Sequence, residues 1–208
     1  MSTGNAPDLP LVLADESSAG PFVTGGPVVR LPADRIDAAL AALTKVKSDH
    51  GIDPTAEIHC RVLFYGDSRR RFGFRSLDPP GCVKLISDCI AAMNMLGATW
   101  WECWVNRDEY PTDLQLVGGE RFDVQAKHLA GVVVQSALVA LHHRSGGPHY
   151  RLSLDPDPTK IDWGLANRVQ ATHFQRTHPQ AIALPEGHKP LLEMADVAAY
   201  TLCRWPWR

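Results

Sequence analysis

Acidic side chains follow two apolar segments that lie far apart in this 208-residue sequence. Asp15, with Glu16 beside it, ends the run Leu11–Ala14, and Asp155 ends the alternating run Tyr150–Leu154. Ligands of open α/β sheets bind beyond the ends of the strands, so acids at these positions are candidate site residues. A turn acid is the commoner role of a single Asp after a strand, and it suits Asp155 equally well in its Asp-Pro-Asp-Pro context.

A third acid, Asp196, lies inside a predicted helix, beside the apolar stripe of that helix. The residues three and four positions away include Leu192, Ala199 and Tyr200. An ionised carboxylate on a face that packs against the core costs several kcal/mol, as an order of magnitude, unless a cation or hydrogen-bond donors compensate it. The ordinary alternative is a structural Asp that is bonded to Lys or Arg.

Glu57 and His59 form a further candidate pair, because they are two residues apart. If the predicted strand Ala56–Phe64 is extended, both side chains project to the same side. A Glu and a His in this arrangement ligate a metal or share a proton. The plain alternative is the exposed face of a surface strand.

Taken together, these acids indicate a site only if the fold gathers them at one end of a sheet. Two carboxylates about 4 Å apart repel each other by roughly 4 kcal/mol at a typical effective dielectric, so a cluster of them requires a divalent cation or protonation. Oxygen-rich sites suit Mg²⁺ or Mn²⁺. Two such ions activate water and stabilise the leaving oxygen in phosphodiester hydrolysis, so the pattern favours that chemistry.

The sequence also has a basic cluster, in which phenylalanines alternate with arginines: Arg69, Arg70, Arg71, Phe72, Phe74 and Arg75. Such a cluster is suited to clamping phosphates and stacking a base. A solvated loop anchored by two aromatic rings is an equally good interpretation. Lys160 is placed to orient a phosphate, although a surface lysine is the simpler interpretation.

Alternating strands and helices must position these residues. The predicted strands are 11–14, 22–31, 56–64, 99–105, 150–155 and 180–184, and the second of them is interrupted by a turn or bulge at Gly25-Gly26-Pro27. The first predicted helix is capped by Asp34 and ended by Gly51, and the later helices are 82–96, 122–142, 161–177 and 190–204. Loops are predicted over 68–81 and 107–119. The pattern indicates an α/β fold in a single domain over residues 11–208, after a loose lead-in over 1–10. We expect a mixed sheet of about five strands with helices on both faces.

The composition is typical of a globular protein, with 45% hydrophobic and 21% charged residues. A formal net charge of −2 excludes a globally basic nucleic-acid coat, but not a local basic patch or a metal that supplies positive charge. The five cysteines include no C-x-x-C pair, which argues against a cysteine-based metal or redox site. Cys82, Cys89, Cys103 and Cys203 lie in apolar runs, which predicts core thiols and a reducing cytoplasm. No signal peptide or membrane-spanning run is visible.

The sequence resembles the domain of unknown function 3800 family. The family's opening D-E-S strand and second strand are similar to Leu11–Gly20 (LVLADESSAG) and the following Phe22–Val29. Its E-x-H element is similar to Glu57-Ile58-His59, and its strand-ending Asp is similar to Leu154-Asp155. Its closing Q-x-x-D helix motif is similar to Glu193–Ala198 (EMADVA). The likeness extends from Leu11 to about Tyr200. The family's Gln is Glu193 here, an added acid that either joins the site or weakens the match.

The resemblance implies a ribonuclease H-like fold with a carboxylate site. By that likeness Asp15, Glu57, Asp155 and Asp196 would bind Mg²⁺ or Mn²⁺, while Glu16 and His59 would be neighbouring or acid–base groups. Nuclease or phosphoryl-transfer chemistry is then inferred by analogy with the fold.

Three functions are compatible with these observations. The preferred one is a metal-dependent nuclease or phosphodiesterase, in which Mg²⁺ or Mn²⁺ raises the melting temperature by binding the folded state. The alternative is a non-catalytic module on the same fold that binds nucleic acid or a protein. A hydrolase of a small phosphorylated or nucleotide substrate also suits the charge of −2. A serine nucleophile is disfavoured because no G-x-S-x-G elbow occurs.

Overall fold

The computed structural model describes residues 9–19, 23–106, 113–115, 121–123, 126–144, 150–154 and 184–204. Its main sheet contains β1 (Leu11–Ala14), β2 (Ser17–Ala19), β3 (Val23–Leu31), β4 (Thr99–Asn106) and β7 (Arg151–Leu154). β1 pairs in parallel with β7 and antiparallel with β3, and the other edge of β3 pairs antiparallel with β4. The predicted mixed sheet is therefore confirmed, with β1 between β3 and β7.

β3 runs without a break through Gly25-Gly26-Pro27, where the sequence predicts a turn or bulge. The prediction is wrong because the small residue there serves packing between the sheet and a helix. A Cβ on Gly26 would lie 2.6 Å from the backbone nitrogen of Val134, in α5 (Ala126–Arg144). Glycine at this position therefore lets α5 lie directly against β3.

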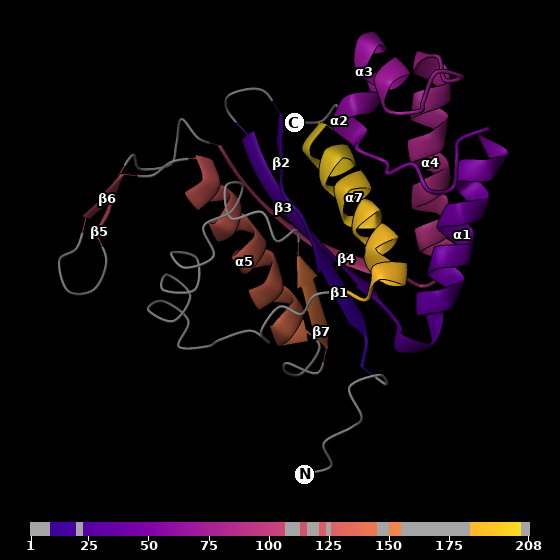
Figure 1. The fold of residues 1–208 in the computed structure, drawn as a ribbon. Helices are drawn as coiled ribbons and strands as arrows, with labels where there is room; N and C mark the ends of the chain where they lie inside the picture. Colours follow the sequence, from indigo (N-terminus) through magenta and orange to yellow (C-terminus); the bar gives the residue numbers. More distant parts are fainter. Residues whose placement is uncertain are drawn as a thin grey trace.

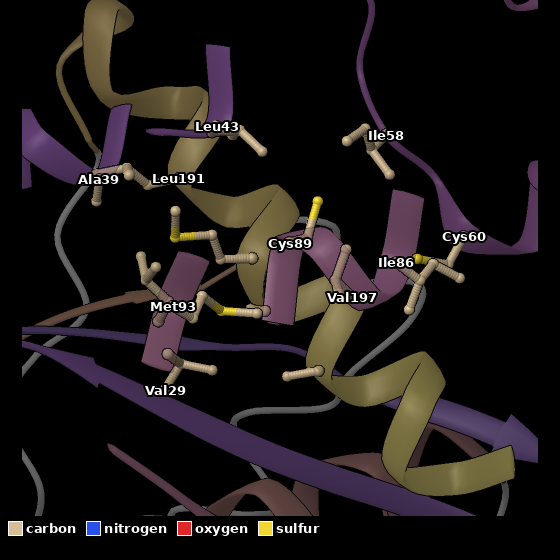
Figure 2. Packing of buried hydrophobic residues seen from close by; sticks show 14 of the residues in the cluster. Val29, Ala39, Leu43, Ile58, Cys60, Ile86, Cys89, Met93, Leu191 and Val197 are labelled. Atoms are coloured by element: carbon tan, nitrogen blue, oxygen red, sulfur yellow. The ribbon is translucent and has the colours of Figure 1, made fainter. Parts of the chain in front are cut away.

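Helices cover both faces of the sheet, as predicted (Figure 1). α5 packs on one face and α7 (Leu192–Arg204) on the other, and α4 (Pro79–Met95) packs against both α7 and α1 (Ile36–Asp49). The alternation of side chains along β1 sends Leu11 and Leu13 into the core around α7, and Val12 and Ala14 into the smaller core under α5. Figure 2 shows residues from α1, α4 and β3 converging on α7 in the larger core.

The helix ends differ from the predictions by a few residues. Asp34 lies in a short 3₁₀ helix, η2 (Ala33–Arg35), and does not cap α1, whereas Gly51 follows the end of α1 with a positive φ of 66°, as its predicted role requires. α4 begins before the predicted Cys82 because Asp78 caps it, accepting a hydrogen bond from the Gly81 N–H at 2.7 Å. A second 3₁₀ helix, η3 (Glu186–Leu191), precedes α7.

The predicted strand over 56–64 is not part of a sheet. His59 is extended, but α2 (Cys60–Leu63) follows it directly, and α3 (Gly66–Arg71) extends into the predicted loop over 68–81. Ile58 and Cys60 are buried while Glu57 and His59 are exposed, so the strand-like alternation is real. It arises from an extended segment that is held by side chains of α7 instead of by a neighbouring strand.

A small antiparallel sheet of β5 (Asp113–Gln115) and β6 (Arg121–Asp123) occupies part of the predicted loop over 107–119 and the predicted start of the helix over 122–142. Cys82 and Cys89 are buried free thiols, as predicted, and Cys103 is half-buried. Asp155, Lys160, the helix over 161–177 and all but the last residue of the strand over 180–184 lie outside the described residues. Among the helices that the structure describes, none has both the length and the apolar character that a bilayer crossing demands.

Candidate functional site

Asp15 and Glu16 lie at a break in the central strand. β1 ends at Ala14 and β2 begins at Ser17, and both pair with the same edge of β3. The Asp15 N–H donates to the carbonyl oxygen of Pro27 at 3.5 Å. A regular antiparallel pair would need a return bond from the N–H of residue 27, which proline lacks. Pro27 therefore explains why the ladder stops here and two acids occupy the break.

Asp196 lies on α7 between the buried residues Ala195 and Val197, as its predicted position on the apolar stripe requires. Its Oδ2 accepts a hydrogen bond from the Cys60 N–H at 2.7 Å, at the start of α2. The Cys60 thiol also donates a hydrogen bond to Asp196. Backbone and thiol donors thus compensate part of the cost of burying this carboxylate.

The structure brings Asp15 and Asp196 together from opposite ends of the chain. Burial raises the pKa of Asp15 well above its ordinary value, and the negative charges of Glu16 and Asp196 raise it further. The hydrogen bond from the Glu16 N–H to Asp15 Oδ1, at 2.8 Å, lowers the pKa of Asp15 but does not offset these effects. The negative charges of Glu16 and Asp196 therefore both act on Asp15, beside the end of β1.

The Cys60 thiol is part of the same environment. Burial raises the pKa of Cys60 well above its ordinary value, and the nearby charges of Asp196 and Asp15 contribute to the shift. The thiol therefore stays protonated and is a poor nucleophile. Its geometry fits a hydrogen-bond donor that holds Asp196.

Glu193, one turn before Asp196 on α7, is bound to partners outside this acidic group. Its Oε1 accepts a hydrogen bond from Lys47 Nζ at 2.8 Å, and its Oε2 accepts one from the Ile58 N–H at 3.0 Å. Burial raises the pKa of Glu193, and the Lys47 ammonium works in the opposite direction. The added acid of the Q-x-x-D-like motif is thus half of a buried ion pair, and it holds the segment that carries Glu57 and His59.

Glu57 and His59 project to the same side, as predicted, but toward solvent. Their side chains are exposed, and His59 Nε2 lies 3.3 Å from Glu57 Oε1. The carboxylates whose charges act on Asp15 are Glu16 and Asp196. Within the part of the chain that the structure describes, no group of three or more His, Cys, Asp or Glu side chains is arranged to hold a metal ion.

No protein-family model matches this sequence, and no curated protein matches it. Two solved structures are similar. Bst-RNase HIII in complex with Mn²⁺ is 12% identical with a TM-score of 0.54, and the match covers 95% of this chain and 53% of that chain. A mutant protein of Bst-RNase HIII, in which an alanine replaces a glutamine, is 12% identical with a TM-score of 0.52, and the match covers 94% of this chain and 52% of that chain.

The chain has a ribonuclease H-like fold. This confirms the fold that the sequence resemblance implies, and at such low identity the likeness extends to the fold alone. The chain spans about half the length of the two ribonuclease HIII chains.

The predicted substrate-binding arginines have different surroundings. Arg69 Nη1 donates to the carbonyl oxygen of Leu63 at 2.7 Å, so this side chain ties α3 to α2. Arg70 is exposed and pairs with Asp67. The guanidinium of Arg71 lies 5.8 Å from the centre of the Phe72 ring, within cation–π range.

Sequence reasoning missed Lys47, which is central to this region. Its signal is present in the spacing, because the buried residues of α1 are Ile36, Ala39, Leu43 and Lys47, at intervals of three or four. A lysine that continues an apolar stripe requires a buried acid, and Glu193 on α7 is that acid.

Proposed function

We propose that this chain is a metal-dependent phosphodiester hydrolase of the nuclease type, with Mg²⁺ or Mn²⁺ bound by Asp15, Asp155 and Asp196. The observation that carries the proposal is that Glu16 and Asp196 lie near Asp15, because the negative charges of both oppose the ionisation of Asp15. Carboxylate oxygens are the preferred ligands of these cations, and bound cations would relieve the repulsion. The donor set therefore fits the metal chemically.

Asp155 supplies the third carboxylate in this proposal. β7 is parallel to β1, and its last residue, Leu154, is the register partner of Ala14. Asp155 follows Leu154 by one peptide bond, just as Asp15 follows Ala14. Acids that follow the ends of adjacent parallel strands leave the sheet at the same edge, where ligands of α/β sheets bind.

The residues around Asp15 and Asp196 have distinct roles in the proposed reaction. A divalent ion held by Asp15, Asp155 and Asp196 would supply Lewis-acid polarisation of the phosphate and would lower the pKa of a water molecule. Asp15 provides negative charge at the break after β1, and the Cys60 N–H fixes the carboxylate of Asp196. Glu57, which the sequence resemblance gives as a metal ligand, is 65% exposed, and it is proposed here, with Glu16 and His59, as an acid–base group at the edge of the site.

Two likenesses support the proposal. The sequence motifs resemble those of the domain of unknown function 3800 family in their order along the chain, and membership of that family is part of the proposal. One of the structurally similar proteins is a ribonuclease HIII in complex with Mn²⁺. The proposed substrate is accordingly a nucleic acid, and the proposed cofactor Mg²⁺ or Mn²⁺.

The test is hydrolysis of labelled single- and double-stranded DNA and RNA by the purified chain, with Mg²⁺, with Mn²⁺ and with a chelator. We expect metal-dependent cleavage that Asp15→Asn and Asp196→Asn abolish. Asp37→Asn is the matched control, because Asp37 is 97% exposed on α1 and should leave cleavage unchanged. Cleavage that persists in Asp15→Asn, or in the chelator, would overturn the proposal.

The non-catalytic binding module remains the second candidate, and one observation favours it. Within the described residues no three potential ligands are arranged around a metal position. If the acids are a structural cluster, Mn²⁺ leaves the melting temperature unchanged and nucleic acid is bound without being cleaved. The catalytic proposal predicts a higher melting temperature with Mn²⁺ and the loss of that increase in Asp15→Asn.

A further inference from the structure

Large aromatic side chains are exposed around α2 and α3. Phe64 is 37% exposed, Tyr65 61% and Phe72 48%. Tyr65 and Phe72 flank α3 and are seven residues apart, close to two helical turns, so their backbone positions fall on the same side of α3. We call these three rings, with the arginines of the same segment, the aromatic–basic surface.

The arginines make this surface positive in a chain that is negative overall. Residues 60–78 contain five arginines and two aspartates, a net charge of +3, whereas the whole chain carries −2. Arg61, Arg70, Arg71 and Arg75 are exposed. This local charge is complementary to a phosphate backbone.

The segment that displays these groups is anchored in the larger core by one buried ring and is held in shape by hydrogen bonds within itself. Phe74 is fully buried, and its N–H donates to the carbonyl oxygen of Arg69 at 2.9 Å. Arg75 Nε donates to the carbonyl oxygen of Arg70 at 2.9 Å. The exposed rings are therefore presented by an anchored scaffold, which lowers the entropic cost of binding a ligand.

The surface is continuous with the acidic site through α7. Phe64 stacks on Tyr200 with a centroid distance of 5.3 Å and an interplanar angle of 1°. Tyr200 is one helical turn beyond Asp196, a rise of about 6 Å along the helix axis. α2 packs beside this end of α7 (Figure 1), and its first residue, Cys60, holds Asp196.

We infer that the aromatic–basic surface binds single-stranded nucleic acid, with bases stacked on Tyr65 and Phe72 and phosphates on the arginines. The inference rests on the proposed function for where the strand leads, namely to the site at Asp15 and Asp196. Single strands expose the faces of their bases to aromatic rings, whereas in a duplex those faces are stacked on one another. Exposed rings beside arginines thus favour a single strand over a duplex.

The test measures binding separately from catalysis. The Asp15→Asn variant of the 208-residue chain is titrated, with a chelator present, against fluorescein-labelled oligothymidylate, and anisotropy gives the dissociation constant. Tyr65→Ala and Phe72→Ala should each weaken binding by about 5- to 150-fold, the range for loss of one stacked base. Tyr65→Trp should retain affinity, and Met95→Ala, which alters an exposed apolar residue on α4, is the matched control.

Melting temperatures equal to that of the parent establish that the alanine variants are folded. Arg71→Gln and Arg75→Gln should weaken binding and reduce its salt dependence. Affinity that is unchanged in both ring variants, equal affinity for a duplex of the same sequence, or equal competition by an acidic peptide would each overturn the inference. Because no metal is present, failure here is distinguishable from failure of the catalytic proposal, which is read from metal-dependent cleavage.

Discussion

The buried ion pair between Lys47 and Glu193 allows a quantitative prediction. In Lys47→Met, the Glu193 carboxylate keeps its bond from the Ile58 N–H but loses the ammonium group 2.8 Å away. The two side chains are 1% and 4% exposed, so water cannot replace the lost partner. The variant therefore leaves a buried charge whose desolvation is no longer compensated.

Removing one partner of a buried ion pair costs about 3–5 kcal/mol. In a domain of about 150–250 residues each kcal/mol lowers the melting temperature by about 2–4 °C, so we expect Lys47→Met to lower it by about 6–20 °C. The loss should shrink at lower pH. Burial already holds the pKa of Glu193 above its ordinary value, so the folded state favours the protonated carboxyl. The contribution of Glu193 to the free energy of unfolding therefore increases as the pH falls from its pKa in the folded state toward its pKa in the unfolded state.

Lys45→Met is the matched control, because Lys45 lies on the same helix and also pairs with an acid. Its Nζ is 2.7 Å from Asp49 Oδ2, but the side chains are 73% and 57% exposed. Such a pair contributes about 0.3–0.5 kcal/mol, so the melting temperature should fall by no more than about 2 °C. The double variant Lys47→Met with Glu193→Gln keeps an acceptor for the Ile58 N–H without the charge, and should recover most of the loss.

The assay is thermal and urea denaturation of the four proteins at neutral pH and at about pH 5, a range chosen from the direction of the Glu193 shift. Two results would refute the reasoning. One is a Lys47→Met melting temperature that matches that of Lys45→Met. The other is a double variant as unstable as Lys47→Met, because the uncompensated charge would then not be the cause.

Three further predictions concern the site and its scaffold. Without metal, Asp15→Asn should raise the melting temperature at neutral pH, because burial and the nearby acids raise the pKa of this carboxyl and make its ionised form unfavourable. The gain should vanish in a pH series as the pH falls and the carboxyl of the parent protein becomes protonated. An unchanged melting temperature at neutral pH would contradict this prediction. Gly26→Ala should lower the free energy of unfolding, measured in urea, by about 1–3 kcal/mol, because the added Cβ meets the backbone of Val134. Gly187→Ala is the control and should not lower the free energy of unfolding in this way, because the space around Gly187 is open. Equal losses in the two variants would exclude the packing argument. Cys60 should be alkylated much more slowly in the native than in the urea-unfolded protein, as followed by peptide mapping, and equal rates would show that its thiol is accessible and ionised.

The parts of the fold that the sequence predicts well are those in which local pattern and tertiary role agree. The run Leu11–Ala14 is apolar at every position because β1 is covered on both faces, and it ends at acids because Pro27 interrupts the ladder. Asp196 stands out because a carboxylate within an apolar stripe needs compensation, and its partner is the Cys60 N–H. These signals are visible without knowledge of the pairing.

Other features depend on partners that are distant in the sequence. Gly25-Gly26-Pro27 has the residues of a turn, and its role in a continuous strand follows from α5 packing on it. Buried and exposed residues alternate over 56–60 because the backbone there is extended. The backbone N–H groups of Ile58 and Cys60 are bound by the carboxylates of α7 instead of by a neighbouring strand, and the alternation is the same in both cases, so the pattern alone does not distinguish them. Lys47 is hidden because a lysine on a helix is ordinarily a surface residue, and Glu193 lies far along the chain.

The most direct test of the metal-binding proposal is an anomalous difference map from crystals of the chain soaked in Mn²⁺. The proposal predicts density bounded by the side chains of Asp15 and Asp196, and its disappearance in crystals of Asp15→Asn. A map without density at that position under saturating Mn²⁺, or with density that Asp15→Asn leaves unchanged, would contradict it.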